Sequence, residues 1–157
     1  MTRRWLLLTT AILIGAAIGI GGYTFVYADG HSYLTDNPSA CANCHIMDEH
    51  YRAWLTGSHG GVAGCNECHT PQDNVASKYT VKAKNGFWHS LRFTTGEFPY
   101  PIRITEPNRD VVEGACRSCH GPVVEAIDHG ATASAATEGE DALRCVQCHR
   151  YVGHQVR

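Results

Sequence analysis

The longest apolar stretch of the chain lies in its first thirty residues. From Trp5 to Ala28, 24 consecutive residues carry no charge, while Arg3 and Arg4 precede this run and Asp29 follows it. A helix of that length, rising about 1.5 Å per residue, would cross a hydrocarbon core about 30 Å thick with some tilt. The pattern predicts a transmembrane anchor at residues 5–28.

The two arginines predict the orientation of this anchor. Because basic residues favour the cytoplasmic side, we expect residues 1–4 in the cytoplasm and residues 29–157 in the periplasm, outside a bacterial inner membrane. A cleaved signal peptide is the alternative, since Val26-Tyr27-Ala28 resembles a small-residue cleavage site. The apolar run is longer than the roughly 7–15 residues of a signal core, which favours the anchor.

A second periodic pattern occupies the middle of the chain. Apolar residues recur every four positions from Val75 to Leu91, which predicts a helix that Asp73 or Asn74 caps. The stripe beside them is polar: Lys78, Lys82, Asn85 and His89. This stripe is either the solvated side of a half-buried helix or a site that offers donors and a proton acceptor together. The second interpretation is favoured by aromatic residues of the kinds found at membrane interfaces: Tyr79, Phe87, Trp88 and Phe93.

Three other segments have the composition of connections. Residues 29–40 are polar, and residues 96–110 contain Pro99, Pro101 and Pro107, which favour a loop over a helix. Residues 130–142 are small, polar and turn-prone, so we expect a surface loop there.

Cysteine and histidine form one five-residue pattern four times. The copies are Cys41-Ala42-Asn43-Cys44-His45, Cys65-Asn66-Glu67-Cys68-His69, Cys116-Arg117-Ser118-Cys119-His120 and Cys145-Val146-Gln147-Cys148-His149. The pattern is typical of c-type haem attachment, in which two thiols form thioethers with the porphyrin and the histidine lies where it can ligate the iron. Zinc sites do not require a histidine directly after every second thiol, and disulfides would not place eight thiols in one repeat. The sequence therefore predicts four covalently bound haem c groups.

Haem also explains how so polar a chain could fold. Aliphatic residues are sparse after residue 28, so porphyrins must supply most of the buried apolar area, and we expect the apo-chain not to fold. The net charge of −2 gives no reason to expect a nucleic-acid partner. We predict a mainly α, haem-dominated multihaem cytochrome c with one N-terminal transmembrane helix and little regular β structure. Two dihaem halves, about 41–70 and 116–154, would be joined by the amphipathic helix and a loop.

These features together resemble the NapC/NirT/NrfH family of membrane-anchored multihaem quinol dehydrogenases. The similarity covers the anchor, the four motifs, Met47 after His45, the stretch from Lys82 to His89 and a short C-terminus. The compactness of the chain makes it most like the NrfH branch, the small subunit of cytochrome c nitrite reductase.

The resemblance implies ligands for the four irons. Met47 would take the axial position on haem 1 in place of His45. His69 would bind haem 2, which in the nitrite reductase assembly takes its other ligand from a lysine of the catalytic subunit. The remaining haems would each have two histidines: His120 and His154 on haem 3, and His149 and His59 on haem 4. Irons with two histidine ligands suit electron transfer, because no ligand changes on reduction.

The resemblance also implies a quinol site at Lys82, Asn85 and His89. Well-known relatives carry an acidic residue at position 85 or 89, whereas this chain has Asn85 and His89. His89 would then be the one titratable proton acceptor near neutral pH on the stripe.

The expected function is oxidation of menaquinol by an electron-transfer subunit of a hetero-oligomer. The electrons would pass through the haems to a periplasmic multihaem reductase, in the first place a pentahaem ammonia-forming nitrite reductase. One alternative is the same quinol dehydrogenase serving a nitrate reductase, a trimethylamine-oxide reductase or a soluble cytochrome. Others are a tetrahaem enzyme that reduces a small substrate at an open haem, and a soluble-type shuttle, which the anchor disfavours.

Overall fold

The computed structural model describes residues 2–130 and 144–154, and within these two ranges the chain is mainly helical and has no β-strand. This confirms the predicted fold class. The chain divides into two compact units, with the boundary between Thr35 and Asp36.

The first unit contains one long helix and one short 3₁₀ helix. α1 spans Thr2–Tyr27 and η1 spans Gly30–Leu34. From Arg3 to Tyr27, α1 is long and apolar enough to cross a membrane, and none of it is buried by protein. Exposing so many large apolar side chains to water would be costly, which fits a helix whose surroundings are lipid.

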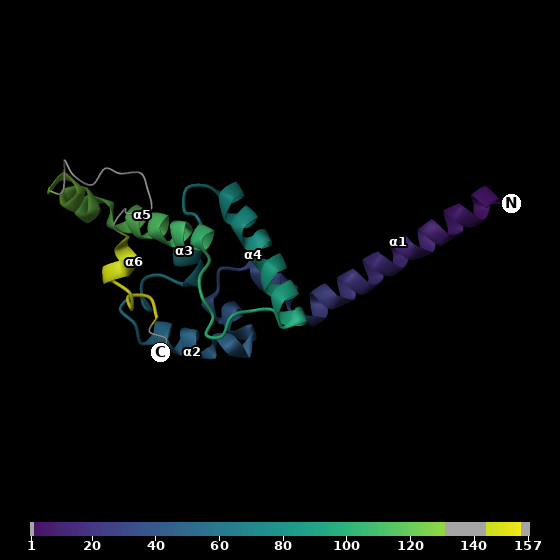
Figure 1. Ribbon diagram of the computed structural model, residues 1–157, viewed down its shortest axis with the longest axis horizontal. Helices are drawn as coiled ribbons and strands as arrows, with labels where there is room; N and C mark the ends of the chain where they lie inside the picture. The colour runs from purple at the N-terminus through teal and green to yellow at the C-terminus, as the bar shows by residue number, and fades with distance from the viewer. Residues whose placement is uncertain (1, 131–143, 155–157) are drawn as a thin grey trace. The chain divides into compact units, whose positions relative to one another are not determined.

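The second unit is a series of helices and 3₁₀ helices (Figure 1), and the Cys-x-x-Cys-His motifs lie on or directly after them. In chain order they are η2 Pro38–Asn43, η3 His45–Met47, α2 Asp48–Leu55, α3 Cys65–His69, α4 Val75–Thr95, α5 Glu106–Gly130 and α6 Cys145–Cys148. α3 and α6 both pack against α5, and α2 packs against η2 and η3. Because α3, α5 and α6 carry the second, third and fourth motifs, α5 brings these three motifs together.

α4 confirms the helix predicted from the period-four apolar pattern. The Asn74 side chain accepts a hydrogen bond from the backbone N–H of Ser77 at 2.8 Å, which caps the first turn. At the other end Gly96 has a φ of 75°, the left-handed conformation in which a glycine commonly ends a helix. The polar stripe is therefore carried on a helix of 21 residues with both ends defined.

α5 begins inside the segment that the prolines predict to be a loop. Residues 96–110 are expected to form a loop, but α5 already starts at Glu106. Pro107 is compatible with the first turn of a helix, where the N–H that proline lacks would have no intrahelical acceptor. α5 kinks at His120, whose φ of −99° and ψ of 15° are not helical, two residues before Pro122. The loop predicted at residues 130–142 lies, except for Gly130, outside the described residues.

The described residues bury almost no apolar side chain. Ala115, at 7% exposure, is the one buried hydrophobic residue in the described ranges, and the buried polar residues there are Thr70 and Lys82. Burial of apolar surface is the main favourable contribution to folding, so these side chains alone do not supply a core. The missing apolar contact must come from groups attached to the protein.

Candidate haem sites and the polar cluster on α4

The cysteine pairs lie on short helical turns. Three residues of helical spacing place the two thiols of a Cys-x-x-Cys pair on one side of a turn, which allows both to reach one porphyrin. The second and fourth pairs lie on α3 and α6, the third lies within α5, and the first lies in and just after η2. None of the eight cysteines is paired in a disulfide.

Neighbouring motifs lie close together in the order of the sequence. The Cys65 thiol shares a hydrogen bond with Cys41, which lowers the pKa of Cys41 to about 7 and raises the pKa of Cys65. Burial, followed by the charge of Cys116, raises the pKa of Cys68. Burial also raises the pKa of Cys145 to about 11, and Cys116 contributes to this shift as well. The second motif therefore neighbours the first and third, and the third neighbours the fourth.

The arrangement fits haem better than it fits a metal ion held by protein side chains alone. In the part of the chain that the structure describes, no three His, Cys, Asp or Glu side chains gather as ligands of a metal ion. The paired thiols are thus not arranged as tetrahedral zinc sites. The pairs instead provide the repeated thiol attachment points that c-type haem requires.

His59 is fixed by the segment that follows the fourth motif. Its Nδ1 atom lies 3.2 Å from the carbonyl oxygen of Val152, and the Ser58 hydroxyl donates to the same oxygen at 3.2 Å. The Ser58 hydroxyl also lies 3.1 Å from Nδ1, but its one proton goes to the carbonyl. With that arrangement Nδ1 carries the ring proton, and Nε2 is left with the lone pair that a metal ligand needs. The ring of His59 also lies 6.1 Å from the ring of His120.

Three further histidines form a cluster. The His154 ring is stacked with that of His69 at a centroid separation of 6.2 Å, and it contacts His50 edge to face at 5.0 Å. His69 keeps solvent-accessible surface, but many protein atoms surround its ring. This burial, reinforced by the charges of His154 and His50, lowers the pKa of His69 to about 4.

The observed neighbours are not the ligand pairs expected from the resemblance. His59 and His154 each lie beside a motif histidine, but the adjacent rings are those of His120 and His69. Neighbouring rings can bind one iron or two stacked haems, so the assignment of distal ligands to particular haems stays a prediction. His149 and His45 are exposed.

Met47 and His50 flank the start of α2. Met47 is half-buried at the end of η3, one residue before α2 begins. The sequence assigned no role to His50, yet its Nδ1 atom is buried without a hydrogen-bond partner. Burial lowers the pKa of His50. Its position three residues after Met47 was the signal that could have drawn attention to it.

The polar stripe of α4 is only partly solvated. Lys82 is 5% exposed, and its Nζ atom donates to Asp36 Oδ1 at 2.9 Å. Lys78 Nζ donates to the other carboxylate oxygen at 2.5 Å, and Asn66 Nδ2 donates to Oδ1 at 3.0 Å. The hydrogen bonds from Lys78 and then Lys82 lower the pKa of Asp36. Sequence reasoning missed Asp36, although it is one of two acids between the anchor and the first motif and a natural partner for two lysines.

The other two stripe residues lie further along α4. The Asn85 side chain accepts a hydrogen bond from Asn108 at 3.2 Å, which joins α4 to the first turn of α5. His89 is exposed on one side, but burial on the other, followed by the charge of Arg92, lowers its pKa. His89 is also close enough to His69 for its charge to lower the pKa of that ring.

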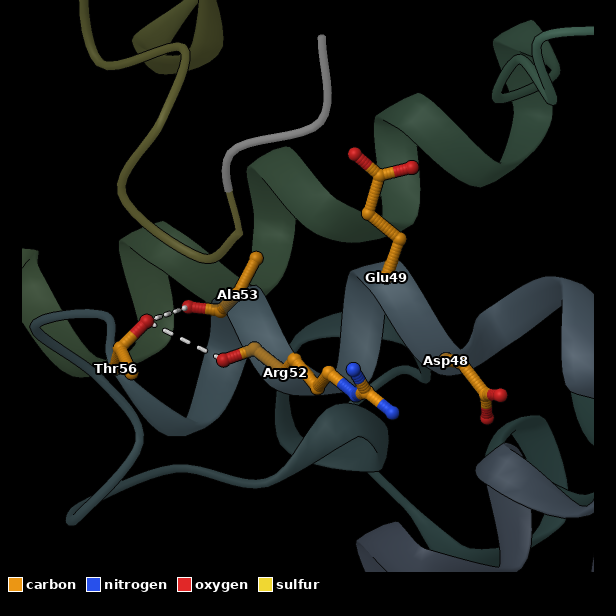
Figure 2. A pocket seen from close by; sticks show the side chains of 5 residues that line it. All are labelled: Asp48, Glu49, Arg52, Ala53 and Thr56. Carbon is orange, nitrogen blue, oxygen red and sulfur yellow. Dashed lines mark hydrogen bonds between the residues drawn. The ribbon is translucent and has the colours of Figure 1, made fainter.

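An open pocket follows the surface of α2 just after Met47 (Figure 2). It is lined by Asp48, Glu49, Arg52, Ala53 and Thr56. The Thr56 hydroxyl lies within hydrogen-bond distance of the backbone carbonyls of Arg52 and Ala53, each at 3.2 Å, and donates to them. A second open pocket lies beside the third motif, between residues 71–73 and α5, and includes Gly114, Ala115 and Ser118. Neither pocket contains a residue of the polar stripe.

A chain with an apolar N-terminal helix and repeated haem-attachment motifs is a membrane-anchored c-type cytochrome. It belongs to the NapC/NirT cytochrome c family, since the profile described as "NapC/NirT cytochrome c family, N-terminal region" matches residues 1–157. Membership of this family establishes covalently bound haem c and a role in electron transfer. The resemblance stated from the sequence is thereby confirmed.

Individual relatives agree with this placement. The chain is 32% identical over 154 residues to cytochrome c-type protein NrfH of Wolinella succinogenes, covering 96% of this chain and 87% of that protein. It is 25% identical to cytochrome c-type protein TorC of Escherichia coli K12, with 99% of this chain matching 44% of TorC. Its fold is similar to the crystal structure of the cytochrome c nitrite reductase NrfHA complex bound to the HQNO inhibitor. The TM-score is 0.59 at 25% identity, covering 89% of this chain and 87% of that one.

Proposed function

We propose that this cytochrome is a menaquinol dehydrogenase that carries four haem c groups and feeds a periplasmic reductase. The observation that carries the proposal is the buried ammonium of Lys82, which is paired with the Asp36 carboxylate. Lys82 lies on the same helix as His89. Both residues lie near haem motifs, because the charge of Lys82 reaches Cys41 and the charge of His89 reaches His69. Similarity to the HQNO-bound NrfHA complex supports a quinol site in this family.

Two residues of α4 have the chemistry needed to orient the quinol and to accept its protons. Oxidation of a quinol to a quinone releases two electrons and two protons, and haem iron supplies the one-electron acceptors. Lys82 can donate a hydrogen bond that orients a ring oxygen. His89 can take the proton of the hydroxyl because its lowered pKa keeps the imidazole neutral near pH 7.

The ligand set expected from the resemblance is retained in this proposal. Met47 would bind haem 1 and His69 would bind haem 2, and the other two irons would each have two histidines. The proton on Nδ1 of His59 supports a ligand role for its Nε2 atom, and the bond to Val152 brings it to the chain around His149 and His154.

The proposed partner is a periplasmic multihaem nitrite reductase that forms ammonia. The 32% identity to NrfH and the structural similarity to the NrfHA complex support a hetero-oligomer of this kind. The chain would be a single-pass protein of the bacterial inner membrane, with its N-terminus in the cytoplasm and its haems in the periplasm. Similarity to TorC over 99% of the chain makes another periplasmic reductase the second candidate partner.

A direct experiment is reduction of the haems by quinol. The holoprotein is purified in mild detergent, mixed with a water-soluble menaquinol analogue and followed by the haem absorbance. Rapid reduction that HQNO inhibits is expected. A protein that dithionite reduces fully but that the quinol analogue does not reduce would contradict the function. Identification of the co-purifying subunit by mass spectrometry decides between the two candidate partners.

A further inference from the structure

Asp36 lies where three otherwise separate parts of the haem unit meet. It precedes the first motif by five residues, and it contacts two lysines of α4 and Asn66 of the second motif. These partners are 30 to 46 residues away in the sequence. The carboxylate therefore connects the first motif, the second motif and the polar stripe through one side chain.

Of the two ion pairs of Asp36, the one with Lys82 is the more buried. At 5% exposure the Lys82 side chain is nearly removed from solvent, whereas the side chain of Lys78 is 22% exposed. A buried ammonium without a counter-charge is strongly unfavourable, so the position of Lys82 depends on a carboxylate beside it. Asp36 supplies that carboxylate, and its pKa is lowered by both lysines, so it stays ionised.

Asp36 itself is not sealed in. Its side chain keeps 42% of its surface exposed, while that of Lys82 keeps 5%. Glu67 is close enough for its charge to raise the pKa of Lys78, so two carboxylates balance the two ammonium groups. Each ammonium has three hydrogen-bond donors, which suit a ligand with oxygen acceptors, and a quinol or quinone ring offers two of these.

We propose that Asp36 is a positioning residue of the quinol site, because it holds the Lys82 ammonium where it meets a ring oxygen of the quinol. This inference rests on the proposed function and assigns to that site a residue outside α4. Asp36 acts through Lys82 rather than on the quinol itself. Its loss should therefore weaken quinol binding more than it slows the chemistry, and it should have no effect once Lys82 is gone.

The test is a double-mutant cycle with Asp36→Asn, Lys82→Ala and the combined variant. For the Asp36→Asn holoprotein we expect KM for the menaquinol analogue, and Kd for HQNO, to rise by at least about tenfold, which is less than for a fully buried charge pair because Asp36 is partly exposed. In the Lys82→Ala background the same substitution should change KM less than about twofold, because coupled residues are not additive. Glu97→Gln removes a carboxylate from the exposed segment after α4 and serves as the matched control.

The cycle also distinguishes positioning from a merely structural link. Additive effects of the two substitutions, or a loss of dithionite-reducible haem equal to the loss of quinol activity, would overturn the proposal. If Asp36→Asn fails to assemble, Asp36→Glu keeps the charge but moves it by one methylene. Raised KM with full haem content is expected there, and an unchanged KM would overturn the proposal.

The outcome separates this inference from the function on which it rests. If Lys82→Ala impairs quinol oxidation while Asp36→Asn binds HQNO and quinol like the wild type, Asp36 has no positioning role and the function stands. If quinol does not reduce the wild type at all, the proposed quinol dehydrogenase function is contradicted, and the role of Asp36 falls with it.

Discussion

His59 donates its Nδ1–H to the backbone carbonyl of Val152 over 3.2 Å, across 93 residues of sequence. This bond fixes which nitrogen carries the proton and how the ring is turned. It also ties the loop before the second motif to the segment after the fourth. A histidine held in this way is prepared to bind iron through Nε2.

We therefore expect His59→Ala to convert one haem from six-coordinate low-spin to high-spin. The physical reason is that removing the ring removes one of two strong axial ligands. Optical and paramagnetic resonance spectra of the ferric protein measure this change, and added imidazole should reverse it. His31→Ala, which removes a histidine of the first unit, is the control. Low-spin spectra for all haems in His59→Ala would show that His59 is not a ligand.

Loss of a single haem should unfold the second unit. Cys116→Ala removes one thioether next to Ala115, the one buried hydrophobic residue among the described positions. Because protein side chains supply so little buried apolar area, the missing contacts cannot be replaced locally. Limited proteolysis should degrade this variant under conditions that leave the wild type intact. A protease-resistant product with three haems would contradict the haem-core argument.

The sequence predicted the elements that depend on local pattern. The period of the apolar residues, with Asn74 as the cap, predicted α4. The four repeated motifs, together with the scarcity of aliphatic residues after residue 28, predicted a unit whose fold depends on haem. Pro107 was misleading because the same residue that breaks a helix interior is tolerated in a first turn. Local pattern thus predicted α1 and α4, whereas it gave no prediction of a helix at α5 and predicted a loop where α5 begins.

The polar contacts of the site could not be predicted in the same way. A helical stripe containing Lys82 looks identical whether the lysine is solvated or buried, and its partner Asp36 is 46 residues away. His50 likewise gave no sign that its Nδ1 atom would be buried without a partner. Both facts depend on how segments that are distant in the sequence pack together, and a periodic pattern carries no information about that packing.

Met47 is expected to raise the reduction potential of haem 1. A thioether ligand favours ferrous iron relative to an imidazole, so Met47→His should lower the potential of one haem and leave the others nearly unchanged. Reduction by the menaquinol analogue should slow, because the first acceptor becomes less favourable. A spectroelectrochemical titration measures the potentials. Identical titrations of the variant and the wild type would show that Met47 is a packing residue.

Lys82 should matter far more than its neighbour Lys84. Both lie on α4 and carry the same charge, but Lys82 is buried against Asp36 while Lys84 is exposed. We expect Lys82→Ala to slow quinol-driven haem reduction by at least about tenfold, as for the loss of a positioned polar group. Lys84→Ala should leave the rate within about twofold, since exposed charges contribute little. Equal effects of the two substitutions would mean that only the overall charge of the helix matters.

The pH dependence of quinol oxidation should report on His89. Burial and the charge of Arg92 place its pKa below the ordinary 6.5, so the imidazole is a neutral proton acceptor at pH 7 and becomes protonated only as the pH falls through that lowered value. Quinol-driven reduction should therefore be flat around neutrality and fall by about tenfold per unit on the acid side. Arg92→Gln removes one cause of the low pKa and should move the acid limb to higher pH. His89→Ala should lower the rate by at least about tenfold and abolish the limb, with dithionite-reducible haem unchanged. An acid limb that persists unchanged in His89→Ala would assign the proton acceptor to another group.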